Sequence, residues 1–277
     1  MTEKIDTSVG FTPYEISLCL YDVPRTRMWK EAIEDVVEPG DVVVDAGSGT
    51  GILSVFAAKA GAEKVYAVEI HPRFVTLIDH IAERNNFGDV ITTIDADASK
   101  VDIPEEVDVI VAELLCTGQF FEPEVQVVNH LRQFLRDDGR VIPSRVRSYI
   151  RLVDGQESLY GVLVDTDSRS IVLDDDEPVS TKVCYDRLDF SEQNPSIVDT
   201  TVSVKARKSR RADAVMIEGE ADLTERIETY PTKFLYNPEI CFLDEPVQLE
   251  CDEEYAVDIT YPYGGDTLDA EISVRRI

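Results

Sequence analysis

Residues 42–69 read VVVDAGSGTGILSVFAAKAGAEKVYAVE, and the rest of the chain can be placed around them. The first three residues are apolar and β-branched, which is typical of a buried parallel strand. Closely spaced glycines follow, then apolar residues at helical spacing up to Gly61, and then a second apolar run that ends at Glu69. The pattern predicts a strand, a glycine turn, a helix and a second strand with an acid at its end.

The glycines Gly47, Gly49 and Gly51 are spaced as GxGxG, and Asp45 precedes the first of them by two residues. Glycines let the backbone approach a ligand, and an acid closing the second strand can accept hydrogen bonds from both ribose hydroxyls. Ile52 replaces the third glycine of a dinucleotide fingerprint, so a pyrophosphate is not indicated. Asp45 suits a cationic ligand instead, and S-adenosylmethionine carries an amino group and a sulfonium. We therefore expect this segment to bind S-adenosylmethionine; a turn that only connects strand and helix is the alternative.

The chain has 277 residues, of which 43% are hydrophobic, and carries a net charge of −28. This length allows two domains with a sizeable core. Such acidity does not provide the broad cationic surface that nucleic acids bind, so it disfavours nucleic acid as a partner. A salty cytoplasm and a basic substrate explain the acidity equally well.

The five cysteines are scattered without CxxC spacing, which is typical of reduced thiols in an intracellular protein. The three histidines are not near paired cysteines, so we expect no metal site. No signal peptide opens the sequence, and no apolar run approaches the ~20 residues of a membrane helix. We expect a soluble cytoplasmic protein that does not bind membranes.

Strand and helix patterns alternate up to residue 143. Apolar runs predict strands at 90–94 and 107–112, amphipathic spacing predicts helices at 71–86 and 122–135, and a turn is expected at 138–139. This alternation is typical of an α/β fold with a doubly wound, Rossmann-like parallel sheet, whose ligand crevice lies at the carboxyl ends of its strands. The acids expected at these ends are Glu69, Asp97 and Glu113.

Both ends of the chain differ from this middle part. Residues 1–40 are mostly helical in pattern, with a break at Pro24, and we interpret them as a lid segment over the cofactor. Residues 41–143 form the cofactor domain. From 144 to 277, alternating segments predict an all-β, barrel-like or sandwich domain that holds the substrate. The strands expected there lie at 147–152, 158–164, 200–206, 214–221, 256–261 and 268–274.

Several motifs resemble those of one family. DVPRT, residues 22–26, is similar to a D-x-x-R-T segment, and 42–69 is close to that family's cofactor motif throughout. Glu113 and Glu122 match the spacing of a two-glutamate hairpin, and VIPSR, residues 141–145, is similar to the junction into a barrel. With these motifs the chain resembles the protein arginine methyltransferases, which join a class I S-adenosylmethionine domain to a β-barrel.

The resemblance covers residues 15–155 well and implies a cofactor site. Arginine pairs with carboxylates in a bidentate manner, which suits the methionine end of the cofactor. The implied roles are Arg25 for the cofactor carboxylate, Gly47 and Gly49 for the methionine portion, Glu69 for the ribose, and Asp97 with Ala98 or Ser99 for the adenine. Asp95 is an alternative to Asp97, and a surface charge is the alternative for Arg25.

The resemblance also implies that Glu113 and Glu122 are catalytic. A guanidinium is a poor nucleophile because its charge is delocalised. Two carboxylates that hold it can align one nitrogen with the methyl carbon and localise positive charge on the others, so catalysis would rest on positioning and electrostatics. For Glu122 the alternative is an ordinary acid at a helix N-terminus.

The sequence departs from the family around the acceptor site. The family's S-E-W-M-G-Y reads AELLCT at 112–117, and its T-H-W loop is matched only by Thr232-Lys233-Phe234. A lysine at this point can pair with Asp22 but does not supply the proton chemistry of histidine. We therefore take Asp22, Cys116 and Lys233 as further candidates for the substrate site.

These departures leave the methyl acceptor open. A protein side chain, arginine first, is the favoured acceptor; RNA, another residue such as cysteine, and a small molecule are the alternatives. The basic run KARKSRR, residues 205–211, is more typical of a strand edge or hairpin tip than of an RNA contact. A non-catalytic, cofactor-binding subunit of a partner is a further possibility, and a homodimer is compatible with the sequence.

Overall fold

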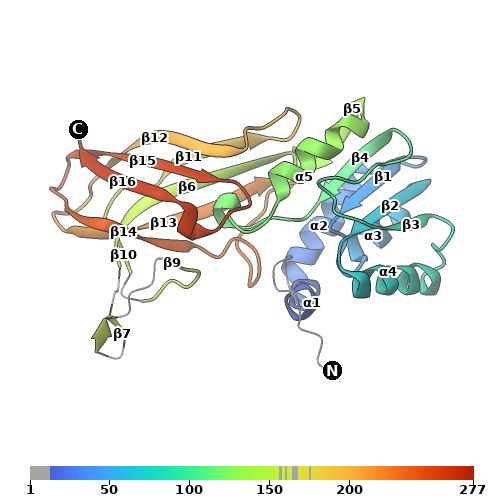
Figure 1. The fold of residues 1–277 in the computed structure, drawn as a ribbon, viewed down its shortest axis with the longest axis horizontal. Helices are drawn as coiled ribbons and strands as arrows, with labels where there is room; N and C mark the ends of the chain where they lie inside the picture. The colour runs from blue at the N-terminus through green and yellow to red at the C-terminus, as the bar shows by residue number, and fades with distance from the viewer. Residues whose placement is uncertain (1–12, 156–157, 160, 164–167, 175) are drawn as a thin grey trace.

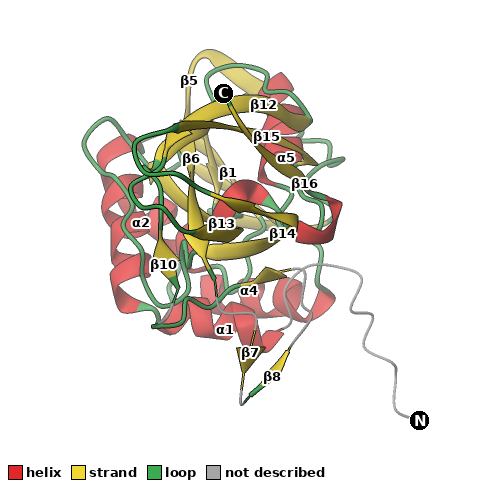
Figure 2. Cartoon of the chain, turned by 90° about the vertical axis from the view of Figure 1, so that its left-hand side faces the viewer, coloured by secondary structure: helices red, strands yellow, loops and turns green. Residues whose placement is uncertain are grey.

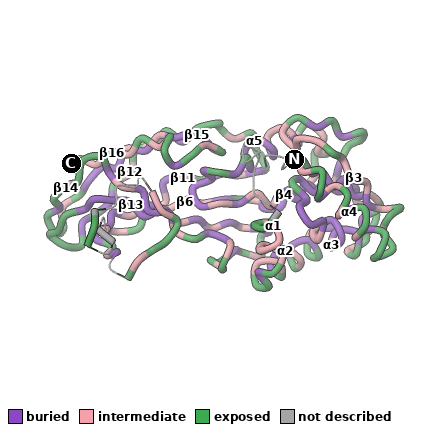
Figure 3. Tube along the Cα trace, turned by 60° about the horizontal axis from the view of Figure 1, so that its bottom comes forward, coloured by how far each residue is buried: buried purple, intermediate pink, exposed green. Residues whose placement is uncertain are grey.

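The computed structural model describes residues 13–155, 158–159, 161–163, 168–174 and 176–277. An α/β domain, coloured blue to green, lies beside an elongated β domain coloured yellow to red (Figure 1). Buried segments run through both of them (Figure 3), and one continuous hydrophobic core includes Trp29, Val111, Ile150 and Tyr261. The two domains therefore share a single packed interior.

Two helices open the described chain, α1 (Pro13–Tyr21) and α2 (Val23–Val36). They separate at Asp22, whose carboxylate caps α2 by accepting a hydrogen bond from the backbone N–H of Arg25 at 3.4 Å. The break thus comes just before Pro24, which occupies the first turn of α2, where its missing N–H costs no helical hydrogen bond. Trp29 and Ile33 are fully buried and dock α2 on the core.

The α/β domain contains a five-stranded parallel sheet in the order β3-β2-β1-β4-β5. The order reverses beside β1, and an open sheet of this kind binds ligands at that point. The strands are β1 (Val42–Ala46), β2 (Lys64–Glu69), β3 (Ile91–Asp95), β4 (Val107–Ala112) and β5 (Leu135–Ile142). The helices between them are α3 (Ile52–Ala60), α4 (Pro72–Arg84), η1 (Thr117–Gln119), α5 (Glu124–Leu131) and η2 (Arg132–Phe134).

Two expectations for this domain were wrong in detail. The helix expected at 122–135 begins only at Glu124, because a residue before proline avoids the helical conformation and Pro123 therefore excludes Glu122. The turn expected at 138–139 lies inside β5. Val107 pairs with Leu135 while the next partners are Val109 and Arg140, so the extra residues bulge out of the ladder.

The second domain is all-β, as predicted. Its strands surround a common interior when viewed end-on (Figure 2). One sheet has the order β10-β6-β13-β14-β9 with β11 added to β6, and another has the order β12-β15-β16. The long strands are β6 (Arg145–Asp154), β11 (Val183–Asp189), β12 (Ile197–Lys205), β13 (Arg211–Asp222), β14 (Glu239–Gln248), β15 (Glu254–Pro262) and β16 (Glu271–Arg276). The short elements are β7 (Ser158–Leu159), β8 (Val162–Leu163), β9 (Ser168–Arg169), β10 (Glu177–Pro178) and η3 (Thr267–Asp269).

The sequence patterns missed β11 and β14. Strand β14 contains Asp244, Glu245 and Pro246, a combination that predicts a turn rather than a strand. The segment expected as a strand at 158–164 falls partly outside the described residues, and what is described there is the two-residue strands β7 and β8. None of the helices in the described part of the chain is long and apolar enough to span a membrane.

The segment between β4 and α5 lies against the β domain. The Tyr261 hydroxyl, on β15, donates to the carbonyl oxygen of Gly118 at 2.8 Å, and Tyr185 and Tyr261 are joined through their hydroxyls at 2.6 Å. The backbone N–H of Gly264 donates to the carbonyl oxygen of Gln119 at 2.8 Å. The β domain thus fixes the middle of this loop, which we call the two-glutamate loop, residues 113–122.

Candidate functional site

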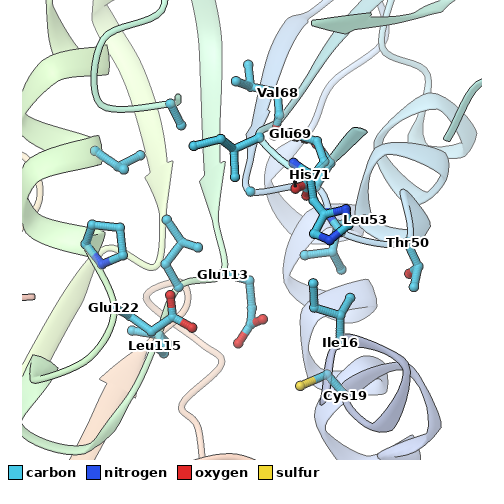
Figure 4. A pocket seen from close by; sticks show the side chains of 18 of the residues that line it. Ile16, Cys19, Thr50, Leu53, Val68, Glu69, His71, Glu113, Leu115 and Glu122 are labelled. Carbon is cyan, nitrogen blue, oxygen red and sulfur yellow. Dashed lines mark hydrogen bonds between the residues drawn. The ribbon is translucent and has the colours of Figure 1, made fainter. Parts of the chain in front are cut away.

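A cavity of about 440 Å³ opens at the carboxyl ends of the parallel strands. Its size is within the usual range for small-molecule sites, ~300–1,000 Å³. It is lined by α1, α2, the glycine turn, the ends of β2 and β4 and the loop after β3, and the β domain contributes Phe234 and Gly264. Figure 4 shows Glu113 and Glu122 at one end of this pocket and Glu69 with His71 at the other.

The glycine turn provides the floor of the cavity. Gly47 and Gly49 both line it and have φ angles of +70° and +51°, which L side chains rarely adopt. A Cβ atom at Gly47 would lie 2.7 Å from Leu114 Cδ2, and one at Gly49 would lie 3.0 Å from Ile16 Cγ2. Only glycine fits this conformation without displacing neighbours, so the turn keeps the cavity open. Gly51 does not line the cavity. It is the N-cap residue of α3 and lies against Ile78.

Asp45 lies beneath the glycine turn. It is almost completely buried, and its Oδ2 accepts a hydrogen bond from the Ser54 hydroxyl at 2.5 Å. Burial raises the pKa of Asp45 to about 6. Asp45 is not among the residues that line the cavity, so the structure gives it a role in holding the turn, and its contact with a cofactor stays a prediction.

Glu69 is held at the end of β2 by two backbone groups. Its Oε2 accepts from the N–H of Gly49 and its Oε1 from the N–H of His71, both at 2.7 Å. These bonds fix the carboxylate in the cavity, and each oxygen keeps a further lone pair. A ribose with two vicinal hydroxyls is the ligand group that such a carboxylate can accept from, as predicted for Glu69.

The loop after β3 brings Asp97, Ala98 and Ser99 to the cavity wall. The Asp97 carboxylate accepts from the N–H and hydroxyl of Ser99 at 2.9 and 2.6 Å, and from Lys100 at 2.7 Å. These hydrogen bonds, together with the charge of Lys100, lower the pKa of Asp97 against the effect of burial. Asp97 therefore shapes the loop, and the backbone near Ala98 is the group left to meet an adenine edge.

Arg25 connects the cofactor end of the cavity to the two-glutamate loop. Its guanidinium pairs with the carboxylate of Glu113, which lies at the end of β4. Both side chains are largely buried, with 11% and 13% of their surface exposed. The Nε of Arg25 is buried and has no hydrogen-bond partner among the described residues. Arg25 thus keeps a donor for a second carboxylate, which fits the predicted contact with the methionine end of S-adenosylmethionine.

Glu122 is the second acid at this end of the cavity. Burial raises its pKa to about 7, and the charge of Arg25 opposes this shift. A carboxylate that titrates near neutrality can both bind a cation and exchange a proton. Glu113 lines the same cavity as Glu122.

The three further substrate-site candidates lie outside the cavity lining. The carboxylate of Asp22 accepts from the Thr232 hydroxyl at 2.6 Å and from the backbone N–H of Phe234 at 2.9 Å. Lys233 is exposed, with its Nζ 5.1 Å from the centre of the Phe234 ring, so the contacts that the structure gives Asp22 come from its neighbours rather than from this lysine. Burial raises the pKa of the Cys116 thiol to about 12, which makes it a poor nucleophile.

The basic run at 205–211 is compensated by acids. Lys205 pairs with Asp252 at 2.8 Å, and Lys208 and Arg210 both pair with Glu177. The run joins β12 to β13, as expected for a turn at a strand end. Lys205, Lys208 and Arg210 are therefore engaged in ion pairs, which disfavours an RNA contact here. Among the described residues, no group of three or more His, Cys, Asp or Glu could hold a metal ion.

Sequence patterns did not single out His71 or Glu124. His71 caps α4 and lines the cavity, and its only signal was its place two residues after Glu69, where β2 ends. Glu124 is fully buried, yet it lies in a helix start where an acid is ordinary. Nothing in the local sequence distinguishes a buried glutamate from an exposed one at such a position.

Comparisons with known proteins agree with this geometry. The family model "Ribosomal protein L11 methyltransferase (PrmA)" matches residues 22–147. The uncharacterized protein MJ1452 of Methanocaldococcus jannaschii is 33% identical over 257 residues, which are 92% of this chain and 94% of that protein. The arginine N(omega)-methyltransferase of Streptomyces achromogenes subsp. streptozoticus is also 33% identical, over 50% of this chain and 40% of its own length.

Solved structures match nearly the whole fold. The Trypanosoma brucei PRMT1 enzyme-prozyme complex with AdoHcy has a TM-score of 0.76 at 20% identity, covering 93% of this chain and 90% of that one. Protein arginine methyltransferase 10 of Arabidopsis thaliana has a TM-score of 0.74 at 17% identity, covering 93% and 95%. They confirm the predicted pairing of a Rossmann-like domain with a β-barrel domain. The chain is therefore an S-adenosylmethionine-dependent methyltransferase, and about half of it resembles the protein arginine methyltransferases.

Proposed function

We propose that this enzyme transfers the methyl group to a guanidinium nitrogen of arginine in a protein substrate. The observation that carries the proposal is that Glu113 and Glu122 line one end of the cavity, opposite Glu69. Two acids in one chamber suit a planar cation with donors on several sides. The relatives named as arginine methyltransferases share the matching half of the chain and support this choice of acceptor.

In this mechanism the bound cofactor supplies an electrophilic methyl group on a sulfonium. Arg25 and Glu69 would hold the cofactor at its carboxylate and its ribose. Glu113 and Glu122 hold the guanidinium, direct the lone pair of one nitrogen at the methyl carbon and keep the positive charge on the other nitrogens. Transfer of the methyl group would leave S-adenosylhomocysteine, and Glu122, with a pKa of about 7, can accept the proton that the nitrogen loses.

The walls of the acceptor chamber are mainly apolar. Leu114, Leu115, Phe121 and Phe234 line the cavity together with the two acids. An apolar wall strengthens the attraction between the carboxylates and a buried cation because it excludes water. The chamber therefore favours a guanidinium at the end of an aliphatic stem. Dimerisation stays a prediction.

A transfer assay with paired peptides tests the proposal. Tritiated S-adenosylmethionine is incubated with the enzyme and a glycine- and arginine-rich peptide, or with the same peptide carrying lysine at each arginine. We expect label only in the first, recovered as methylarginine after acid hydrolysis. Transfer in cell extract, with RNase and protease digestion in parallel, covers the other acceptors. Label in RNA or in another residue overturns the arginine assignment, and cofactor binding without transfer to any acceptor favours a non-catalytic subunit.

The pKa of Glu122 predicts the pH dependence of the reaction. Below about pH 7 Glu122 is protonated in the free enzyme and cannot pair with the guanidinium, so kcat/KM should rise with pH and level off above 7. The measurement is kcat/KM for the arginine peptide from pH 5.5 to 9. In the Glu122→Gln variant, the rise of kcat/KM with pH should disappear, and most of the activity should be lost. If kcat/KM of that variant still rises with pH in the same way, another group is responsible for the pH dependence.

A further inference from the structure

Glu124 is a buried acid behind the two-glutamate loop. It is the first residue of α5, it is 0% exposed, and it does not line the cavity. A fully buried glutamate is rare unless a partner compensates it. Its position two residues after Glu122 places it at the exit of the loop, where a partner on the other side of the loop can be reached.

The partner is the backbone at the entrance of the loop. The Oε2 atom of Glu124 accepts a hydrogen bond from the N–H of Leu114 at 2.9 Å. Leu114 directly follows Glu113, so this single contact joins the two ends of the segment that carries both acids of the cavity. A backbone N–H held in this way fixes the peptide plane between Glu113 and Leu114, and with it the direction in which the Glu113 side chain leaves the chain.

The second carboxyl oxygen of Glu124, Oε1, is also buried. Its Oε1 has no hydrogen-bond partner among the described residues, and the same holds for the Tyr236 hydroxyl. Burial raises the pKa of Glu124 well above its usual range, and the charge of Glu122 adds to this effect. The hydrogen bond from Leu114 needs only an acceptor oxygen, which the carbonyl of a glutamine amide can also supply.

We propose that Glu124 is a positioning residue for methyl transfer, which fixes the orientation of Glu113 through the backbone of Leu114. The proposal rests on the two-glutamate site proposed above. It differs from a purely structural role, in which loss of Glu124 would lower stability without a specific effect on turnover. It also differs from a role as a third carboxylate that binds a cationic acceptor, which would require Glu124 to be charged.

The test compares Glu124→Gln with Glu124→Asn. Both variants carry a neutral amide, but asparagine is one methylene shorter and cannot reach the Leu114 N–H. We expect Glu124→Gln to keep kcat within about threefold of the parent and Glu124→Asn to lose ~10- to 100-fold, the size of effect that misplacement of a catalytic group produces. The cofactor dissociation constant should be unchanged in both, because Glu69 and the glycine turn are not in contact with Glu124.

Glu239 provides the matched control. It is a buried glutamate on β14, 4% exposed, whose pKa is also raised by burial. Glu239→Asn should cost stability without lowering kcat of the folded enzyme. If Glu124→Asn lowers only the melting temperature, as Glu239→Asn does, the positioning role is overturned. If Glu124→Gln loses as much turnover as Glu124→Asn, the charge of the acid is required and the proposal fails in the same way.

Hydrogen exchange keeps this test independent of the acceptor. In both variants the exchange of the peptide spanning residues 114–121 is measured by mass spectrometry with S-adenosylhomocysteine bound. We expect faster exchange in Glu124→Asn and parent-like exchange in Glu124→Gln. If the parent enzyme does not methylate arginine peptides, the proposed function fails, while exchange still decides whether Glu124 holds the loop. Equal exchange in both variants shows that it does not.

Discussion

Replacing Glu113 by glutamine is expected to lower kcat by ~10²–10³-fold, the effect of removing one group that stabilises charge in a transition state. The amide keeps the volume of the side chain but cannot localise positive charge on the guanidinium. Cofactor affinity should be preserved, because Arg25 loses its ion pair with Glu113 and stays available for the cofactor carboxylate. The measurement is single-turnover transfer to an arginine peptide, with cofactor binding followed by calorimetry.

Asp108→Asn is the matched control for this variant. Asp108 lies near the start of β4, the strand that Glu113 directly follows, and its carboxylate also pairs with an arginine, Arg136. Its side chain is 14% exposed, close to the 13% of Glu113. Turnover should be unchanged in Asp108→Asn apart from any loss of stability. Parent-like turnover in Glu113→Gln would rule out the two-carboxylate mechanism.

The second large effect is expected for Gly49→Arg, which should abolish detectable cofactor binding. Gly49 has a φ angle of +51°, and the first side-chain atom at this position would already lie 3.0 Å from Ile16 Cγ2. A longer side chain would have to enter the cavity that the glycine turn keeps open. Calorimetric titration with S-adenosylhomocysteine measures the loss, which we expect to exceed ~100-fold in dissociation constant, or ~2.7 kcal/mol.

Gly40→Arg separates this steric effect from backbone strain. Gly40 has a φ angle of +96°, so a side chain is strained there as well, but a Cβ atom would have no neighbour within 4 Å. Strain of this kind costs ~1–2 kcal/mol of stability. Gly40→Arg should therefore melt earlier yet bind the cofactor normally. If Gly49→Arg binds the cofactor as tightly as Gly40→Arg does, the glycine turn does not form the cofactor site.

The sequence was sufficient to predict the elements that depend on local pattern. Apolar runs ended at Glu69 and Glu113, and the parallel sheet brings both to one edge, as such a sheet must. The glycine turn was also predicted from residue type, and Gly47 and Gly49 have positive φ angles in it. These features are encoded within a few residues of where they act.

Contacts between distant segments were not predictable in the same way. Arg25 and Glu113 are 88 residues apart, and Tyr261 and Gly118 are 143 apart. Their pairing depends on how two domains pack, and a tyrosine in a strand has the same local pattern whether or not its hydroxyl bonds a loop. The burial of Glu124 belongs to this class, because propensity at a helix start favours an acid in either environment.

The hydroxyl of Tyr261 gives the β domain a part in shaping the two-glutamate loop. A module that only presents a substrate could be exchanged between enzymes and would leave the chemistry intact. Here the carbonyl groups of Gly118 and Gln119 are held by Tyr261 and Gly264. The β domain therefore cannot be exchanged without affecting the conformation of this loop. A chimaera that keeps residues 1–143 but takes its β domain from another enzyme would lose the hydrogen bonds from Tyr261 and Gly264 to the loop.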